Sequence, residues 1–176
     1  MHKPSIVRAG EDRFGLMAPG QPAPGWAVSE WLNTTPALPA PTLQSLRGRV
    51  VVLHAFQMLC PGCVLHGLPQ AQRMHAAFDA TDVAVIGLHS VFEHHDAMTR
   101  TALAAFLHEF GIGFPVAIDA PGDDGPLPQT MRAYGLRGTP SLLLYDRRGR
   151  LRRHAFGTED DLLVGAAVAT LLAEAA

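Results

Sequence analysis

The sequence predicts a single α/β domain whose central mixed β-sheet is flanked by helices. Continuous apolar runs at residues 50–56 and 83–89 are typical of strands buried on both faces. Segments with helical spacing of apolar residues alternate with such runs, which is the pattern of a sheet covered on both sides. The chain has 176 residues, 48% of them hydrophobic, which is enough for the core of one ordinary domain.

The first part of the chain is expected to contribute little regular structure. Residues 1–24 predict a poorly ordered lead-in, because they are rich in proline and glycine and show no periodicity. The domain itself is predicted over residues 25–176. Its first expected elements are a short strand at 26–32, an irregular stretch at 36–41, a turn at 43–48 and a central strand at 50–56.

A helix is predicted over residues 64–78, with Pro69 inside it as a kink. The elements expected next are a strand at 83–89, an amphipathic helix at 97–110, a short strand at 114–118, a loop at 119–128, a short helix at 129–134, and strands at 141–145 and 151–156 around a tight turn. The tight turn predicts an antiparallel hairpin. A final helix is expected from about residue 159 to 173, with Thr158 as its N-cap and Asp161 three residues later.

The two cysteines of the chain, Cys60 and Cys63, stand two residues apart where an apolar strand gives way to a helix. Two thiols at this spacing can close into a small disulfide ring and reopen. A helix that starts at Cys60 favours its thiolate, because the helix N-terminus has unpaired N–H groups and about half a positive charge. Pro61 suits the first helical position, where its missing N–H is not needed.

Other uses of the cysteine pair are less favoured. A structural disulfide across two residues closes almost no loop and stabilises little. A structural zinc site needs four ligands, and the sequence has no second C-x-x-C, although its nine histidines leave a Cys2His2 site open on numbers alone. Two inert thiols are the third alternative. We favour redox chemistry, because C-x-x-C beside a βαβ pattern is typical of it.

Composition and patterning limit the partners and the compartment. The formal net charge of −2 gives no bias towards nucleic acid or an anionic membrane. No apolar stretch has the length of a membrane helix, and residues 1–12 contain no apolar signal-peptide region. We therefore expect no nucleic-acid or membrane partners, and a cytoplasmic protein in a compartment that keeps thiols reduced. We expect it to be a monomer or a homodimer.

The predicted order of elements, with Cys-Pro-Gly-Cys at the first long helix, resembles the thioredoxin fold. Residues 134–149 contain Gly-Thr-Pro before an apolar strand and Asp-Arg-Arg-Gly after it. This stretch is similar to the thioredoxin-like reductases of the TlpA/ResA and redoxin group. Residues 22–26 and the turn at 43–48 also resemble the N-terminal extension of that group. The resemblance covers roughly residues 20–176.

The resemblance implies a thiol–disulfide oxidoreductase that acts on protein disulfides and is recharged by an upstream thiol reductant. It implies no metal and no cofactor beyond the redox-active Cys60–Cys63 disulfide. We expect Cys60, ahead of the helix, to be the exposed attacking thiol, and Cys63 to resolve the mixed disulfide.

Four further residues are expected to shape the active site. Pro61 and Gly62 separate the cysteines. The resemblance implies a cis bond between Thr139 and Pro140, packed beside the disulfide, although most X–Pro bonds are trans. The backbone of Thr139 would then be free to pair with an extended substrate chain.

Two histidines are candidate proton shuttles. His54 lies in the apolar strand before Cys60, where thioredoxins usually have a buried aspartate that assists proton transfer at the second cysteine. An imidazole there would respond near neutral pH, but a core histidine bonded to backbone is the more favoured interpretation. His66, three residues after Cys63 on the same helix face, either tunes the second thiol or is a surface residue, and the second is favoured.

The segment at residues 89–96 leaves the end of a strand, where α/β folds place functional loops. His89 is a candidate for the active-site groove. His94 and His95 precede a helix, where polar residues are common, and their spacing matches no recognised metal site.

Two other functions remain open at this point. A peroxiredoxin-like peroxidase would have proline seven residues, and threonine or serine three residues, before its reactive cysteine. Leu53 and Gln57 occupy those positions, which argues against efficient peroxide reduction. The second alternative is a binding module whose C-x-x-C pair only senses redox state.

Overall fold

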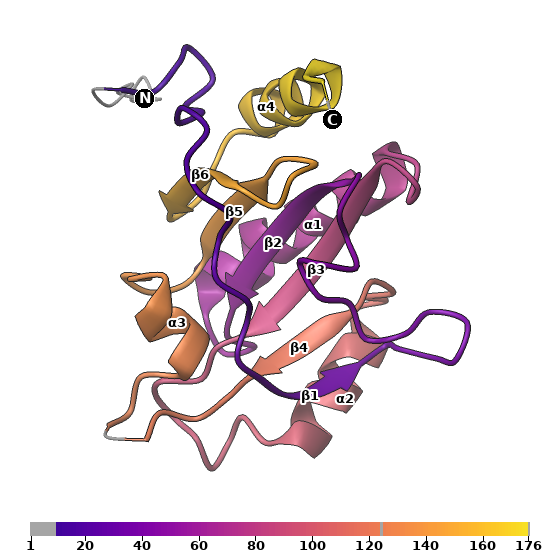
Figure 1. Ribbon diagram of the computed structural model, residues 1–176. Helices are drawn as coiled ribbons and strands as arrows, with labels where there is room; N and C mark the ends of the chain where they lie inside the picture. Colours follow the sequence, from indigo (N-terminus) through magenta and orange to yellow (C-terminus); the bar gives the residue numbers. More distant parts are fainter. Residues whose placement is uncertain (1–9, 124, 176) are drawn as a thin grey trace.

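The structure is a computed structural model that describes residues 10–123 and 125–175 (Figure 1). Over these residues it contains a six-stranded mixed sheet with the order β1-β4-β3-β2-β5-β6. The strands are β1 (Val28–Leu32), β2 (Val50–Phe56), β3 (Val83–His89), β4 (Val116–Asp119), β5 (Ser141–Tyr145) and β6 (Leu151–Phe156). Strands β2, β3 and β4 are parallel, whereas β1 and β5 run antiparallel to their neighbours and β5 and β6 form the predicted hairpin.

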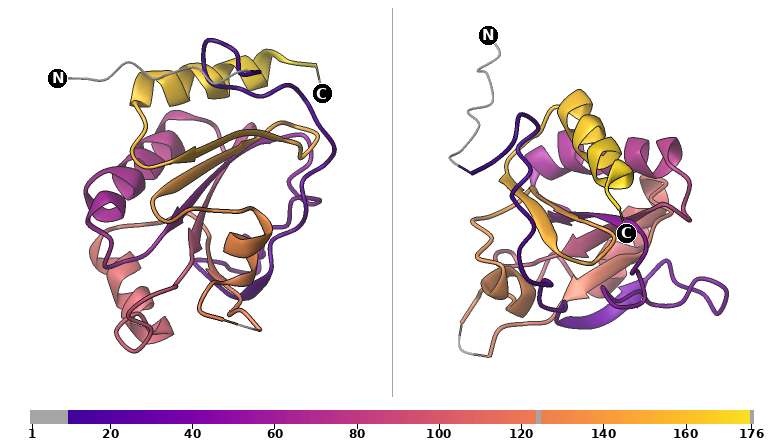
Figure 2. Two further views of the ribbon diagram at one scale, coloured as in Figure 1. Left: turned by 90° about the vertical axis from the view of Figure 1, so that its left-hand side faces the viewer. Right: turned by 45° about the horizontal axis from the view of Figure 1, so that its top comes forward.

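Helices cover both faces of the sheet. They are α1 (Leu68–Ala77), preceded by a π-helical turn η1 (Cys63–Gly67), then α2 (Arg100–Glu109), α3 (Gln129–Ala133) and α4 (Asp161–Ala173). Figure 2 shows α1 and α2 on one side of the sheet and α3 on the other. Side chains of β2 alternate between two apolar clusters, one on each face of the sheet. Val50, Val52 and Phe56 belong to the cluster that includes residues of α4. Val51, Leu53 and Ala55 belong to the cluster that includes α3. Every residue of β2 and β3 is buried, as the apolar runs predicted.

The helix after the cysteines differs from the prediction. The disturbance of the helix that was expected at Pro69 lies one turn earlier and is a π-helical turn. There the N–H of Leu68 bonds to the carbonyl of Cys63, five residues back. Pro69 then lies in the first turn of α1, where its missing N–H is tolerated.

The start of α4 was predicted wrongly. The helix begins at Asp161 and its N-cap is Asp160, not Thr158. The Asp160 carboxylate accepts hydrogen bonds from the N–H groups of Leu162 and Leu163, at 2.9 and 3.3 Å. Both residue types cap helices, and Asp160 has the extended backbone conformation of a cap residue.

Residues 10–24, part of the predicted lead-in, have contacts that the sequence did not indicate; residues 1–9 lie outside the described part. Leu16 is only 2% exposed and belongs to the core. The N–H of Met17 bonds to the carbonyl of Arg152, and Pro22 bridges to Arg150. This segment therefore runs along the outer edge of β6. Within the described residues, no helix is both long and apolar enough to cross a membrane.

Candidate active site

The two cysteines lie where the chain leaves β2 and enters the first helix. The N–H of Cys60 bonds to the carbonyl of Gln57 at 3.1 Å, and the Cys60 carbonyl accepts bonds from Cys63 and Val64 at 3.0 and 3.1 Å. Cys60 is therefore at the helix start, as predicted. Both thiols are free, Cys60 is partly exposed and Cys63 is 0% exposed. The structure thus shows the reduced form, with one reachable sulfur and one covered sulfur.

The sulfur of Cys60 has two close polar contacts. It accepts a hydrogen bond from the N–H of Cys63 at 3.3 Å, and its thiol donates to the carbonyl of Thr139 at 3.4 Å. Burial, and then the side chain of Cys60, raise the pKa of the Cys63 thiol to about 12. Cys63 therefore keeps its proton while Cys60 is a free thiol.

The peptide bond between Thr139 and Pro140 is cis, as the resemblance implied. The Pro140 ring packs against the helix at two glycines. A Cβ atom built on Gly62 would lie 3.2 Å from Pro140 Cδ, and one built on Gly67 would lie 3.1 Å from Pro140 Cβ. Glycine at these two places lets the proline lie directly on the first helical turns, beside the cysteines.

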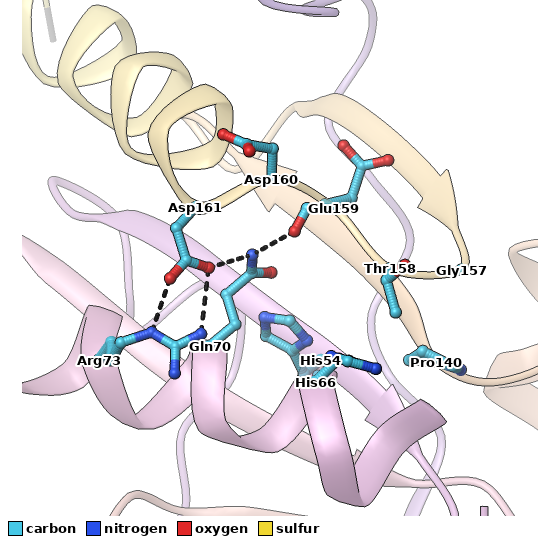
Figure 3. A pocket seen from close by; sticks show the side chains of 11 residues that line it. His54, His66, Gln70, Arg73, Pro140, Gly157, Thr158, Glu159, Asp160 and Asp161 are labelled. Atoms are coloured by element: carbon cyan, nitrogen blue, oxygen red, sulfur yellow. Dashed lines mark hydrogen bonds and ion pairs between the residues drawn. The ribbon is translucent and has the colours of Figure 1, made fainter. Parts of the chain in front are cut away.

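His54 is buried beside Pro140 and is 3% exposed. Neither ring nitrogen has a hydrogen-bond partner among the described residues. His54 is therefore a core histidine, as the favoured interpretation held, but the backbone hydrogen bond expected for it is not formed. Burial lowers the pKa of His54 to about 4, against which Asp161 raises it, so the imidazole is neutral near pH 7. His66 is exposed and lines the same pocket as His54 (Figure 3).

Gln57 is a site residue whose role the sequence did not reveal. Its side chain is 1% exposed, accepts a bond from the N–H of Phe92 at 3.1 Å and donates to the Glu93 carboxylate at 3.3 Å. It joins the cysteine loop to the loop after β3. The available signal was a polar side chain directly after a buried strand, and such side chains need partners.

The other histidines lie apart from this arrangement. His89 is 1% exposed, packs on the Phe56 ring with centroids 5.2 Å apart, and does not line the pocket beside Pro140. Burial lowers the pKa of His89 to about 4. His94 and His95 are exposed. Across residues 10–123 and 125–175, no three His, Cys, Asp or Glu side chains form a group suited to a metal.

Comparison with known proteins identifies the family. The AhpC/TSA family model matches residues 19–154, which is most of the chain. The chain belongs to the AhpC/TSA family. Among solved structures, it is 57% identical to the thioredoxin-like superfamily protein SPOA0173, with a TM-score of 0.85 over 89% of this chain and 99% of that one. It is 51% identical to a thiol-disulfide isomerase from Corynebacterium glutamicum, with a TM-score of 0.83 over 88% and 97% of the two chains.

A curated relative is longer. Protein DipZ from Mycobacterium tuberculosis is 29% identical over 148 residues, which are 84% of this chain and 20% of DipZ. The chain therefore spans about a fifth of the length of this relative. Together, the similarities confirm the thioredoxin fold and place this AhpC/TSA member among the redoxin-type, thioredoxin-like oxidoreductases.

Proposed function

We propose that the protein reduces protein disulfides with the Cys60–Cys63 dithiol. The observation that supports this best is the pairing of a reachable Cys60 sulfur, 3.4 Å from the Thr139 carbonyl, with a buried Cys63 directly behind it. An extended substrate chain would pair with the backbone of Thr139, which places its disulfide at Cys60. Pro61, Gly62 and Pro140 shape the surface around that sulfur.

The proposed reaction transfers two electrons to the substrate. The Cys60 thiolate attacks one substrate sulfur, the substrate S–S bond breaks, and one substrate thiolate leaves. The Cys63 thiolate then attacks Cys60 in the mixed disulfide and releases the second substrate thiolate. The chain is left with a Cys60–Cys63 disulfide, which an upstream thiol reductant reduces; no other cofactor is needed. Net reduction fits the cytoplasmic location that we also propose.

The roles of His54 and His66 as proton shuttles also belong to this proposal. In the reduced state, the pKa of Cys63 is about 12 and that of His54 about 4, so proton transfer from the thiol to the imidazole is strongly uphill. Burial is the larger cause of the raised pKa of Cys63 and persists in the mixed disulfide, but there Cys60 carries no thiol and its part of the rise is lost. We therefore place transfer to His54, and from there to the exposed His66, in that intermediate.

Peroxide reduction is not favoured by the site. Leu53 is buried in β2, and the Gln57 side chain is bonded to Phe92 and Glu93. Neither position offers Cys60 a hydroxyl group to orient a peroxide.

Two cysteine variants test the proposal. Cys60→Ser should lose insulin-disulfide reduction, because the attacking sulfur is gone. Cys63→Ser should instead accumulate covalent mixed disulfides with substrate proteins, seen on non-reducing gels and by mass spectrometry. The wild type should show little peroxide consumption in parallel. If the wild type turns over insulin while Cys63→Ser traps no partner, the assigned roles are wrong.

A further inference from the structure

A polar pocket of about 390 Å³ lies beside Pro140, and the reaction proposed above uses only two of its residues, His54 and His66, as proton shuttles. It is lined by His54, His66 and Gln70, by Arg73, and by the loop from Gly157 to Asp161. Figure 3 shows the His54 ring in the middle of this pocket, with Gln70 and Arg73 on one side and His66 and Pro140 on the other.

The buried imidazole of His54 indicates that the pocket accommodates a ligand group. It is 3% exposed, and both of its nitrogens lack a partner among the described residues. Buried polar atoms without partners are rare in proteins, because leaving them unpaired costs free energy. Since burial keeps the ring neutral near pH 7, one nitrogen is an acceptor and does not repel a cation.

The charges around the pocket favour a cation. Three consecutive acidic residues line it, Glu159, Asp160 and Asp161, against the single guanidinium of Arg73. The carboxylates of Glu159 and Asp160 point away from the His54 ring (Figure 3), so their charge acts on the pocket at longer range. That guanidinium is already engaged by Asp161, at 2.6 and 3.2 Å. Glu159 pairs with Arg153, which lies outside the pocket lining.

The position of the pocket connects it to the substrate. Pro140 lines the pocket and directly follows Thr139, whose carbonyl contacts the Cys60 sulfur. A polypeptide joined to Cys60 and paired with Thr139 passes over this proline, so side chains next to its cysteine come within reach of the pocket.

We propose that this pocket binds the ammonium or guanidinium group of a basic side chain that flanks the reacting cysteine in the substrate polypeptide. The assignment rests on the disulfide-reductase function proposed above and adds a substrate preference to it. His54 accepts a hydrogen bond from the cationic group, and the net negative charge of the 159–161 loop supplies the attraction.

The test uses pre-reduced protein and single-turnover reduction of three disulfide peptides that differ only in the residues beside the cysteine: lysine, glutamine or glutamate. We expect the lysine peptide to react fastest and the glutamate peptide slowest. Asp160→Asn keeps a helix cap while removing one charge, and should lower the lysine-to-glutamine rate ratio at least about threefold. Asp82→Asn, a charge change directly before β3 and outside the pocket lining, is the matched control and should leave the ratio unchanged.

Equal rates for the three peptides, or a ratio that Asp160→Asn does not change, would overturn the inference. No reduction of any peptide would instead contradict the proposed function. To distinguish binding of a free small amine from binding of a substrate side chain, n-butylammonium is added and the His54 ring signals are recorded by NMR. If these signals shift while the peptides show no preference, the pocket binds small amines and the substrate assignment is wrong.

Discussion

Gln57 shows how a single side chain can hold the loop that presents the cysteines. Its backbone carbonyl accepts the N–H of Cys60, while its side chain bonds to the N–H of Phe92 and to the Glu93 carboxylate. One residue thus fixes the position of Cys60 relative to the loop after β3. Because the side chain is buried, these bonds are not replaced by water when it is removed.

We expect Gln57→Leu to lower the free energy of unfolding by about 1–3 kcal/mol, because it leaves the half-buried Phe92 N–H without its partner. The rate of insulin-disulfide reduction should fall as well, since the cysteine loop loses its attachment. Urea denaturation and the insulin assay measure the two effects. Gln44→Leu, at an exposed position, is the matched control. Equal stability of the Gln57 and Gln44 variants would show that the bonds contribute little.

The sequence predicted part of the site at this scale. Cys60 and Cys63 have the predicted difference in exposure, and the cis bond at Pro140 is confirmed. The partners of Gln57 were not predictable, because Phe92 and Glu93 are more than thirty residues away and no periodicity relates the two loops. The absence of partners for His54 has the same cause: it depends on where Pro140 packs in the fold.

Among the elements, the beginning of α4 depends on one capping contact. Asp160 accepts bonds from two N–H groups of the first turn, which otherwise lack partners in the helix. Thr158 makes no cap contact with this helix, although its residue type suits the role.

Asp160→Ala should therefore lower the free energy of unfolding by about 1 kcal/mol, and Asp160→Asn should restore most of it. Thr158→Ala should have a smaller effect, since its hydroxyl does not cap α4. Thermal and urea denaturation of the three variants provide the comparison. A larger loss in Thr158→Ala than in Asp160→Ala would support Thr158 as the true cap.

Strands were easier to predict than helix ends. β2 and β3 have the predicted bounds, because both are apolar throughout and sit at the centre of the sheet. Helix ends depend on a few hydrogen bonds and shift by one or two residues without changing the apolar pattern. The π turn before α1 left no signal beyond Pro69, because it consists of a change of bonding partner and not of residue type.

At the scale of the whole molecule, two buried histidines make stability depend on pH. Burial lowers the pKa of both His54 and His89 from 6.5 to about 4. The unfolded chain therefore binds these protons at higher pH than the folded chain does. Their contribution to stability is complete above about pH 6.5 and is lost as the pH falls through 4.

We expect each histidine to reduce the free energy of unfolding by on the order of 3 kcal/mol across this range. Burial raises the pKa of Asp119, so protonation of this carboxylate stabilises the folded chain over part of the same pH range and opposes the loss caused by the histidines. Variants are therefore needed to isolate the contribution of the histidines. His54→Leu and His89→Phe should each flatten the pH dependence of urea unfolding between pH 7.5 and 4.5. His95→Gln, at an exposed position, is the control. An equally steep dependence in the Leu and Phe variants would contradict this account.

The α/β class, the mixed sheet and the hairpin were predictable, because they follow from alternating local patterns. The path of residues 10–24 was not, since it is fixed by single contacts of Leu16, Met17 and Pro22 with distant parts of the domain. Contacts of this kind have no period in the sequence.

That path has a consequence for self-association. A sheet edge with free N–H and C=O groups can recruit a strand from a second molecule, and such pairing leads to dimers or to aggregation. Here Met17 already pairs with Arg152 of β6, and Pro22 with Arg150 just before that strand. These contacts hinder growth of the sheet at this end of β6, which makes β1, the opposite edge, the alternative place for a strand of a second molecule to pair.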